Sequence, residues 1–280
     1  MFINISKIIL LGLFLLISST IYAHEDLSLR IKEKTKEISK DSKNSKLYFD
    51  RGFLYQQHEE FCKALCDYLK SEDLGNTEQL LNYRKAEVCF SLTDYSTALQ
   101  YVNQYLAVNS PDVKPQKLKA QILMKLTRHS EALDIYGLVI ENTLDIRPED
   151  IVEYSTIFLS IDSTDYAGSI NAIDMGLDML GNNIISLRLK KTDYLKKSNQ
   201  PEKVIEEYDA LIVENHRKEF WYYKKANYLF EINRLPESDI ALQQAKASIR
   251  NLKPKIQNTP AVKDLIVQIE KIEKNINHEN

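Results

Sequence analysis

Three residues with metal-binding side chains follow one another near the start of the chain: His58, Cys62 and Cys66. Histidine nitrogen and cysteine sulfur are ligands that zinc and softer metals prefer. Residues four apart lie on one face of a helix, so a helix over this stretch would align the three side chains. The spacing therefore predicts a small metal site as one hypothesis. The competing interpretation is that these are small, half-buried residues of a helical core.

The stretch His58–Cys62, HEEFC, begins like the zinc motif of metalloproteases, but Cys62 stands where the second histidine is required. The sequence also contains no G-x-S-x-G nucleophile elbow and no glycine-rich phosphate loop. We therefore expect a protein that is not an enzyme and that needs no cofactor and no metal. An enzyme or metal carrier that uses His24 or the His58/Cys62/Cys66 group stays open as the alternative.

The cysteines limit which disulfides can form, because the chain has three of them. Cys62 and Cys66 would project in parallel from one helix, which fits the geometry of a disulfide poorly. Cys89 can pair with either of them, and the sequence does not decide which. One cysteine stays unpaired in any arrangement, which is unusual in an oxidising compartment.

The helices that would position these residues recur along the chain. A compact residue early in one helix returns at regular intervals, as Ala64, Ala98, Ala132, Ser169, Val204 and Ser238. The intervals are 34, 34, 37, 35 and 34 residues. A near-constant period of this length is the sequence signature of a helical solenoid.

A second set of small residues recurs in phase, in the helix that precedes the first: Gly52, Ala86, Ala120, Thr192 and Ala226. An aromatic residue opens the later helix in three copies, as Phe61, Tyr95 and Tyr166. Small residues inside apolar stripes let two helices approach closely. The fourth copy departs from the pattern. It has Ile157 where the small residue is expected, and its interval of 37 residues predicts a looser junction near Ser160–Thr164.

This pattern of small, aromatic and small residues resembles the tetratricopeptide-repeat family over roughly residues 45–252. The resemblance implies an all-α fold, a right-handed α-solenoid of about six antiparallel helix pairs with capping helices at both ends. It also implies that the first helices of the pairs line a concave groove, and that the protein binds a protein or peptide partner.

Two flanking stretches are suited to cap the repeats. Residues 25–40 predict a polar helix with a thin apolar stripe, and the segment 24–44 is the expected N-terminal capping half-repeat. Residues 253–280 predict a C-terminal capping helix and tail, because apolar residues recur at steps of three and four: Val262, Leu265, Ile269, Ile272 and Ile276. A dimerising coiled coil is the alternative, but the stripe covers only about two heptads. We therefore expect a monomer without a second domain.

Residues 1–23 resemble a signal peptide. Lys7 precedes the apolar run Ile8–Ile17, and small residues lead to a cleavage position after Ala23. The run is short for a spanning helix, which needs about 20 residues. We expect cleavage, no membrane span afterwards, and a periplasmic or secreted protein; an uncleaved anchor is the alternative.

The net charge is −3, and both signs are spread along the chain. A nucleic-acid-binding protein usually shows a concentrated basic face, so we expect no nucleic-acid partner.

The resemblance places the partner on the inner face of the first helices. Aromatic residues outside the packing stripe would anchor it, and lysines would set its specificity. The predicted contacts are Phe49, Phe53, Tyr83, Phe90, Lys114, Lys117, Lys125, Tyr154, Phe158 and Tyr223. In the alternative interpretation Phe49 and Phe53 pack on the N-terminal cap, and Phe158 packs on the irregular fourth junction. A purely structural envelope protein, without a bound partner, is a further alternative.

Overall fold

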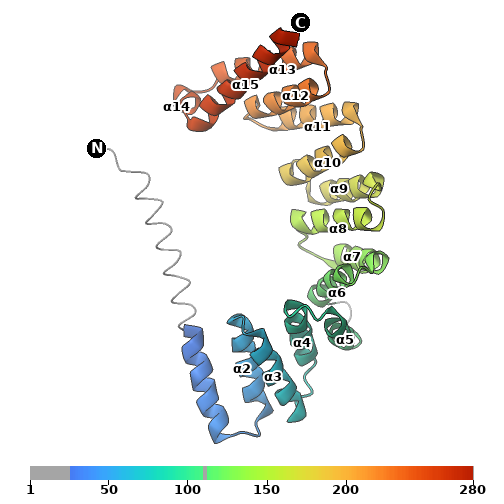
Figure 1. Cartoon of the computed structure of the whole chain (residues 1–280), viewed down its shortest axis with the longest axis vertical. Coiled ribbons are helices and arrows are strands. Elements are labelled where there is room, and N and C mark those ends of the chain that lie inside the picture. Colours follow the sequence, from blue (N-terminus) through green and yellow to red (C-terminus); the bar gives the residue numbers. More distant parts are fainter. Residues whose placement is uncertain (1–25, 110–111, 280) are drawn as a thin grey trace, which may run out of the picture. The chain divides into compact units, whose positions relative to one another are not determined.

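The computed structural model describes residues 26–109 and 112–279, and the regular elements within these ranges are helices (Figure 1). The prediction of an all-α fold is therefore confirmed. The predicted signal peptide, residues 1–23, and His24 lie outside the described residues. Within the two described ranges, no helix is long and apolar enough to cross a membrane.

Consecutive helices of the described chain form antiparallel pairs, each joined by a short turn. In chain order the pairs are α2 (Ser45–Gln57) with α3 (Phe61–Asp73), α4 (Gln79–Ser91) with α5 (Tyr95–Leu106), α6 (Val113–Lys125) with α7 (His129–Asn142), α8 (Pro148–Ile161) with α9 (Tyr166–Leu180), α10 (Ile185–Lys197) with α11 (Pro201–Glu214), and α12 (Glu219–Glu231) with α13 (Leu235–Arg250).

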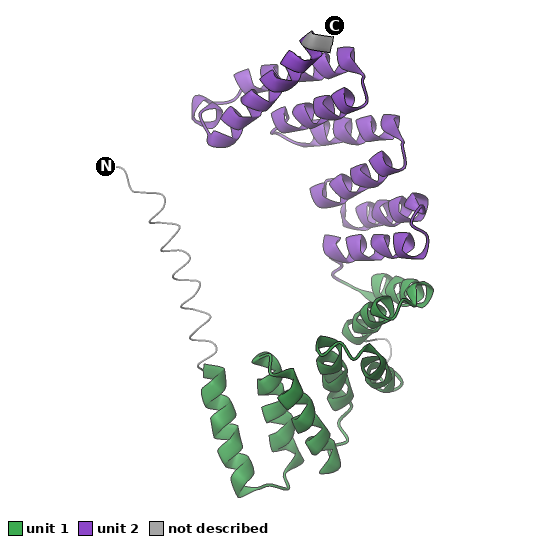
Figure 2. Ribbon diagram, in the orientation of Figure 1, with its two compact units in different colours: residues 1–144 green, residues 145–280 purple. Residues whose placement is uncertain are grey.

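The chain divides into two compact units, residues 1–144 and residues 145–280 (Figure 2). The described part of the first unit contains a helix over residues 26–40 and the helices α2 to α7. The second contains α8 to α13, the short helix α14 (Pro254–Gln257) and α15 (Pro260–Glu279). Each unit has buried clusters of its own, built from the facing stripes of its helix pairs.

Small residues lie at the close contact within each pair. Gly52 of α2 faces α3, and a Cβ atom at Gly52 would lie 2.9 Å from the Tyr68 ring. In the next two pairs the corresponding contacts are made by alanines without exposed surface: Ala86, Ala98, Ala120 and Ala132. A larger side chain at these positions would separate the paired helices, which explains why small residues mark the repeat.

The fourth pair differs from the sequence prediction in its register. In the last pair Ser238 Oγ donates to the carbonyl of Ala226, twelve residues earlier. In the fourth pair Ser169 Oγ donates to the carbonyl of Ser155, fourteen residues earlier. Ser155 therefore occupies the place of the small residue, and the assignment of Ile157 to it is wrong by two residues. The additional residues lie between the two serines, at the end of α8 and in its turn.

The turns within the other five pairs share one geometry. Each has three residues, and the central residue has a positive φ, between 53° and 62°: Glu59, Thr93, Thr127, Asn199 and Asn233. The residue after each of them donates its N–H to a carbonyl five residues earlier, as Asp94 does to Cys89 at 2.9 Å. This left-handed turn closes the carbonyl end of the first helix and reverses the chain.

The turn of the fourth pair has four residues, 162–165, and none of them has a positive φ. Asp165 accepts a hydrogen bond from the N–H of Gly168 and starts α9 as its N-cap. The predicted looser junction near Ser160–Thr164 thus corresponds to a longer turn of a different type.

The helix over residues 26–40 lies beside α2. Ile31 and Ile38 are buried, Lys34 Nζ lies 3.6 Å from a carboxylate oxygen of Asp50, and Arg51 donates to Thr35 at 3.1 Å. The narrow apolar stripe of this helix therefore covers the outer side of the first pair, as a cap requires.

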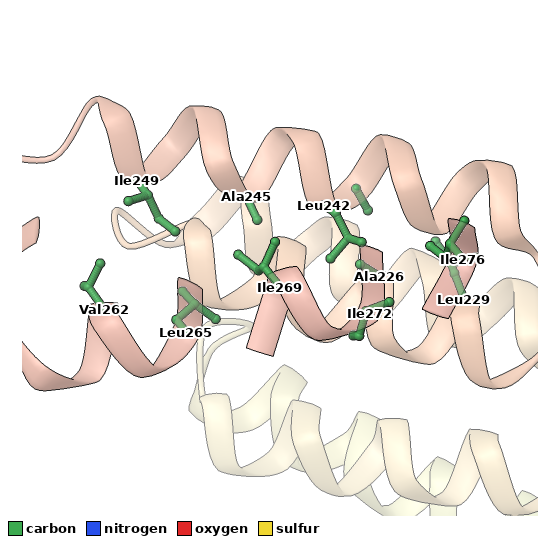
Figure 3. Close-up of a cluster of buried hydrophobic side chains, with 11 residues drawn as sticks. Ala226, Leu229, Leu242, Ala245, Ile249, Val262, Leu265, Ile269, Ile272 and Ile276 are labelled. Atoms are coloured by element: carbon green, nitrogen blue, oxygen red, sulfur yellow. The ribbon is translucent and has the colours of Figure 1, made fainter. Parts of the chain in front are cut away.

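At the other end, α15 lies across α12 and α13 (Figure 3). The complete apolar stripe of α15 is buried there: Val262, Leu265, Ile269, Ile272 and Ile276. These side chains meet residues of α12 and α13 such as Leu229, Leu242 and Ile249. Because the stripe is occupied within its own chain, it is not available for a dimerising coiled coil.

Candidate partner-binding surface

The first helices of the three pairs in the first unit lie beside one another. Contacts join α2 to α4 and α4 to α6, and we call these three helices the first-helix row. The row carries seven of the predicted partner contacts: Phe49 and Phe53 on α2, Tyr83 and Phe90 on α4, and Lys114, Lys117 and Lys125 on α6. The structure therefore brings these seven residues onto neighbouring helices of one unit.

Arg84 joins the aromatic side chains of α2 and α4. Its guanidinium carbon lies 4.7 Å from the centre of the Phe53 ring and 5.9 Å from the centre of the Tyr83 ring. A cation over an aromatic face is attracted by the quadrupole of the ring. All three side chains are half-buried. We call Phe53, Tyr83 and Arg84 the Arg84 cluster, and it presents rings and a cation to the solvent together.

A hydrogen-bonded chain holds an acceptor next to the Arg84 cluster. Arg84 Nη1 donates to Glu87 Oε2 at 2.8 Å, and Gln56 Nε2 donates to the same oxygen at 3.0 Å. Tyr68 Oη donates in turn to Gln56 Oε1 at 2.7 Å. Burial is the largest cause that raises the pKa of Tyr68, so its hydroxyl stays protonated and remains a donor. These hydrogen bonds connect α2, α3 and α4, and they restrict the rotamers of the Arg84 cluster.

Three of the predicted aromatic residues are supported from behind by a ring of the second helix. The ring centres are 5.6 Å apart for Phe49 and Tyr68, 5.5 Å for Tyr83 and Tyr105, and 5.6 Å for Phe90 and Tyr95. Phe49, Tyr83 and Phe90 are each half-buried. One side of each ring thus belongs to the packing of its pair, while the rest is accessible.

Phe53 differs because it borders a hollow of about 360 Å³ beside the N-terminal helix. The other lining residues are Arg30, Glu33, Lys34, Glu37, Asp50 and Leu54. In the alternative interpretation, Phe49 and Phe53 pack on the N-terminal cap. Phe53 does border the N-terminal helix across this hollow, whereas Phe49 packs on Tyr68.

The three predicted lysines of α6 have different surroundings. Lys114 and Lys125 are exposed near the two ends of the helix. Lys117 is half-buried, and its ammonium lies 6.0 Å from the centre of the Tyr136 ring. Lys114 and Lys125 are therefore accessible to a partner, whereas Lys117 also packs against a ring of α7.

The predicted contacts of the second unit take part mainly in packing. Tyr154 and Phe158 lie edge to face with ring centres 5.4 Å apart, and a Cβ atom at Gly168 would overlap the Phe158 ring. Phe158 thus fills the fourth junction, as the alternative interpretation holds. Tyr223 packs against the buried cluster of α12, α13 and α15, and burial raises its pKa. Contact of these three residues with a partner stays a prediction.

The residues of the metal hypothesis do not form a three-ligand site. His58 Nδ1 lies 3.1 Å from a carboxylate oxygen of Glu60, and His58 Nε2 lies 3.2 Å from Ser28 Oγ. No group of three or more metal-binding side chains occurs among the residues that the structure describes. Cys62 and Cys66 are exposed, Cys89 is buried, and all three are free thiols. Burial raises the pKa of Cys89 to about 11.

Sequence reasoning missed a charged position that holds the pairs together. The residue just before the small residue of the first helix is basic in five modules: Arg51, Lys85, Lys119, Lys191 and Lys225. Four of them pair with carboxylates of second helices: Arg51 with Asp67, Lys85 with Glu72, Lys191 with Asp174 and Glu207, and Lys225 with Asp209. Alignment of the repeats contains this signal, since the basic residue precedes the small one in five of the six modules.

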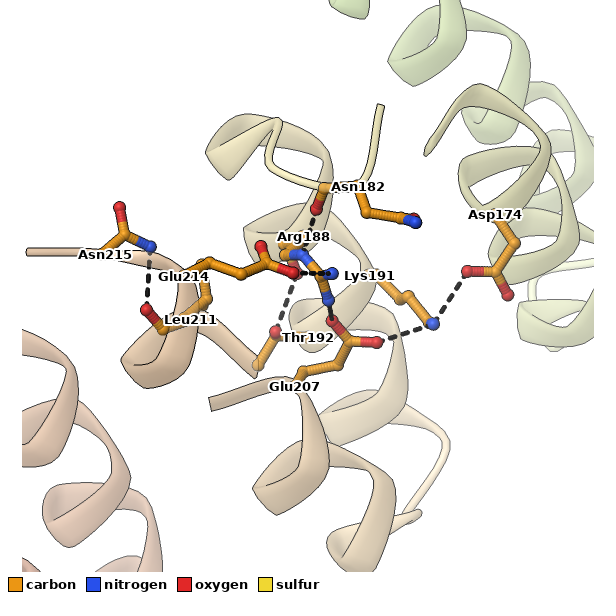
Figure 4. Close-up of polar contacts among 9 residues, drawn as sticks. All are labelled: Asp174, Asn182, Arg188, Lys191, Thr192, Glu207, Leu211, Glu214 and Asn215. Atoms are coloured by element: carbon orange, nitrogen blue, oxygen red, sulfur yellow. Dashed lines mark hydrogen bonds and ion pairs between the residues drawn. The ribbon is translucent and has the colours of Figure 1, made fainter. Parts of the chain in front are cut away.

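In the fifth module this position belongs to a network whose centre, Arg188 and Glu207, is buried (Figure 4). Lys191 Nζ lies 2.8 Å from Asp174 and 2.7 Å from Glu207. Arg188 bonds the other oxygen of Glu207 at 2.9 Å and Glu214 at 3.0 Å. The network joins α9, α10 and α11, and its charges pair with one another across the three helices.

Known proteins resemble this chain in structure and not in sequence. No family model and no curated protein matches the sequence. A tetratricopeptide-repeat protein from Parabacteroides merdae superimposes with a TM-score of 0.53 at 11% identity, over 90% of this chain and 96% of that one. The C-terminal part of a tetratricopeptide-repeat-containing protein from Cytophaga hutchinsonii gives a TM-score of 0.63 at 14% identity, over 85% and 96%.

A third structure, Naa15/Naa10 bound to HypK-THB, gives a TM-score of 0.54 at 16% identity. The match covers 88% of this chain and 37% of that one. At these identities the comparisons establish the fold of the chain.

Proposed function

The chain has the tetratricopeptide-repeat fold, and from this premise we propose that it is a non-enzymatic scaffold that holds a protein or peptide partner. The partner lies against the first-helix row of the first unit. A structure of the same fold, Naa15/Naa10, has been solved in a complex with another protein, which supports this kind of role.

The Arg84 cluster is the observation that carries the proposal. Arginine and aromatic residues dominate the binding energy of protein interfaces. Here a half-buried guanidinium lies near two half-buried rings. Gln56 of α2 donates to its carboxylate neighbour Glu87, and Tyr68 of α3 donates to Gln56. Such a preorganised group loses little conformational entropy when a partner covers it.

The test is a pair of matched double variants. Phe53→Ala with Phe90→Ala removes one ring from each of α2 and α4, and we expect partner binding at least about a hundredfold weaker, because each buried ring contributes roughly 2 kcal/mol. Leu69→Ala with Leu138→Ala is the control, since both leucines are exposed on second helices of the same unit. The partner is obtained by crosslinking in the native cell envelope.

Equal affinities for the wild type and the aromatic variant would contradict the proposal, provided that both melt at similar temperatures. A large loss of stability with unchanged affinity would identify the two rings as packing residues only.

We further propose that the protein is exported, cleaved after Ala23 and monomeric in the periplasm or the medium. The n-region, apolar run and small residues of segment 1–23 support this. Intact mass of protein from the native host gives the position of cleavage, and a retained segment would indicate an anchored protein.

A further inference from the structure

The thiols of Cys62 and Cys66 border one hollow on the surface of the first unit. Cys62 is the second residue of α3, Cys66 follows one turn later, and both are exposed. The hollow has a volume of about 300 Å³, and its lining residues are Arg51, Tyr55, Cys62, Lys63, Cys66 and Asp67. The buried contacts of α3 are made by other residues, such as Ala64 and Tyr68. The two thiols are therefore accessible together, and the core does not require them.

The helix keeps the two thiols too far apart for a disulfide and close enough for a shared metal ion. Cβ atoms four residues apart on a helix are separated by roughly 5–6 Å, whereas a disulfide needs about 3.5–4.5 Å. Two metal–thiolate bonds of about 2.3 Å each span roughly 4.6 Å between the sulfur atoms. Rotation about the Cα–Cβ bonds reaches this separation without unwinding α3.

The surroundings limit such a site to two protein ligands. The ring nitrogens of His58 face Glu60 and Ser28. The Asp67 carboxylate is held by two hydrogen bonds of 2.7 Å from Arg51. Zinc requires four ligands in a structural site, and the described residues offer no group of three. Soft thiolates suit Cu(I), which accepts two ligands.

We propose that Cys62 and Cys66 form a two-thiolate clamp for a soft, two-coordinate cation, with Cu(I) as its ligand. Each thiol releases its proton to solvent and forms one sulfur–copper bond, and the copper keeps its oxidation state. The product carries one net negative charge. Lys63, whose ammonium pairs with Glu60 at the edge of the hollow, and the positive end of the α3 dipole stabilise that charge.

The experiment is an anaerobic titration of the full purified chain with Cu(I) against a coloured competing chelator. We expect one copper per chain in the wild type, together with an ultraviolet sulfur-to-copper absorption band. Cys62→Ser and Cys66→Ser should each remove the tight binding, because a single thiolate leaves the ion half-coordinated. Cys89→Ser is the matched control and should keep it, since Cys89 is buried in another cluster.

Copper uptake that is equal in the wild type and in the Cys62→Ser, Cys66→Ser double variant would overturn the proposal. So would tight binding of Zn(II) in the same titration, because it would require ligands beyond the two thiolates. A circular dichroism spectrum and a melting temperature like those of the wild type show that a variant is folded, so a lost site is separated from a lost fold.

Discussion

At the scale of single residues, the closest helix contacts depend on side chains of minimal size. Ala98 and Ala132 have no exposed surface, and each lies where its helix meets the other helix of the pair. We expect Ala98→Arg and Ala132→Arg each to lower the free energy of unfolding by about 3 kcal/mol or more, because overpacking and an unpaired buried charge add. Thermal melts measure the effect. Ala247→Arg is the control on the exposed side of α13 and should melt like the wild type.

The thiol of Cys89 makes stability depend on pH in the alkaline range. Burial raises its pKa from 9.0 to about 11. As the pH rises, the Cys89 thiol therefore loses its proton in the unfolded chain before it does so in the folded chain. The stability that the buried, neutral thiol contributes is present below pH 9 and is lost as the pH rises toward 11.

We expect the free energy of unfolding of the wild type to fall, relative to Cys89→Ala, by an amount on the order of 2 kcal/mol over this window. Denaturant titrations at several pH values measure it. Parallel curves for the two proteins would show that Cys89 ionises as readily in the folded chain as in the unfolded one.

At the scale of helices and turns, the residue with positive φ differs in type from one pair to the next. Asn199 and Asn233 suit a positive φ, whereas Thr93 and Thr127 are β-branched and adopt it at a cost. We expect Thr93→Gly to stabilise the chain by about 0.5–1 kcal/mol, because glycine adopts this conformation without strain. Asn233→Gly should change stability much less. A Thr93→Gly variant less stable than the wild type would mean that the threonine makes a compensating contact.

The sequence predicts the helix pairs well because each pair repeats one set of steric requirements. The small residues at Gly52, Ala86 and Ala120 recur at the period that the structure shows. The period alone did not identify the small residue of α8. In this pair the close helix contact is made by Ser155 and Ser169, and the additional residues between them shift the register. Phe53 and Tyr83 were predicted, but the role of Arg84 in the Arg84 cluster was missed. Its members come from two helices, and nothing in the local spacing shows that Arg84 crosses over to Phe53.

At the scale of the whole molecule, the helix over residues 26–40 and α15 each cover a face of a helix pair that would otherwise be exposed to solvent. Ile269 of α15 is buried, while Val267 of the same helix is largely exposed. We expect Ile269→Asp to detach α15 and to cause aggregation through the uncovered faces of α12 and α13, because a charge cannot be buried there unpaired. Val267→Asp is the control and should remain soluble. Light scattering of the full-length variants distinguishes the two outcomes.

The packing of α15 on α12 and α13 also closes the open flank of this helix pair. A helix pair whose outer apolar face is uncovered can stack on another pair, either of its own chain or of a second molecule. The exposed side of α15 carries charged residues such as Lys263, Glu270 and Lys271. We therefore expect that a second molecule does not stack on this side of α15, because the charges would lose their hydration.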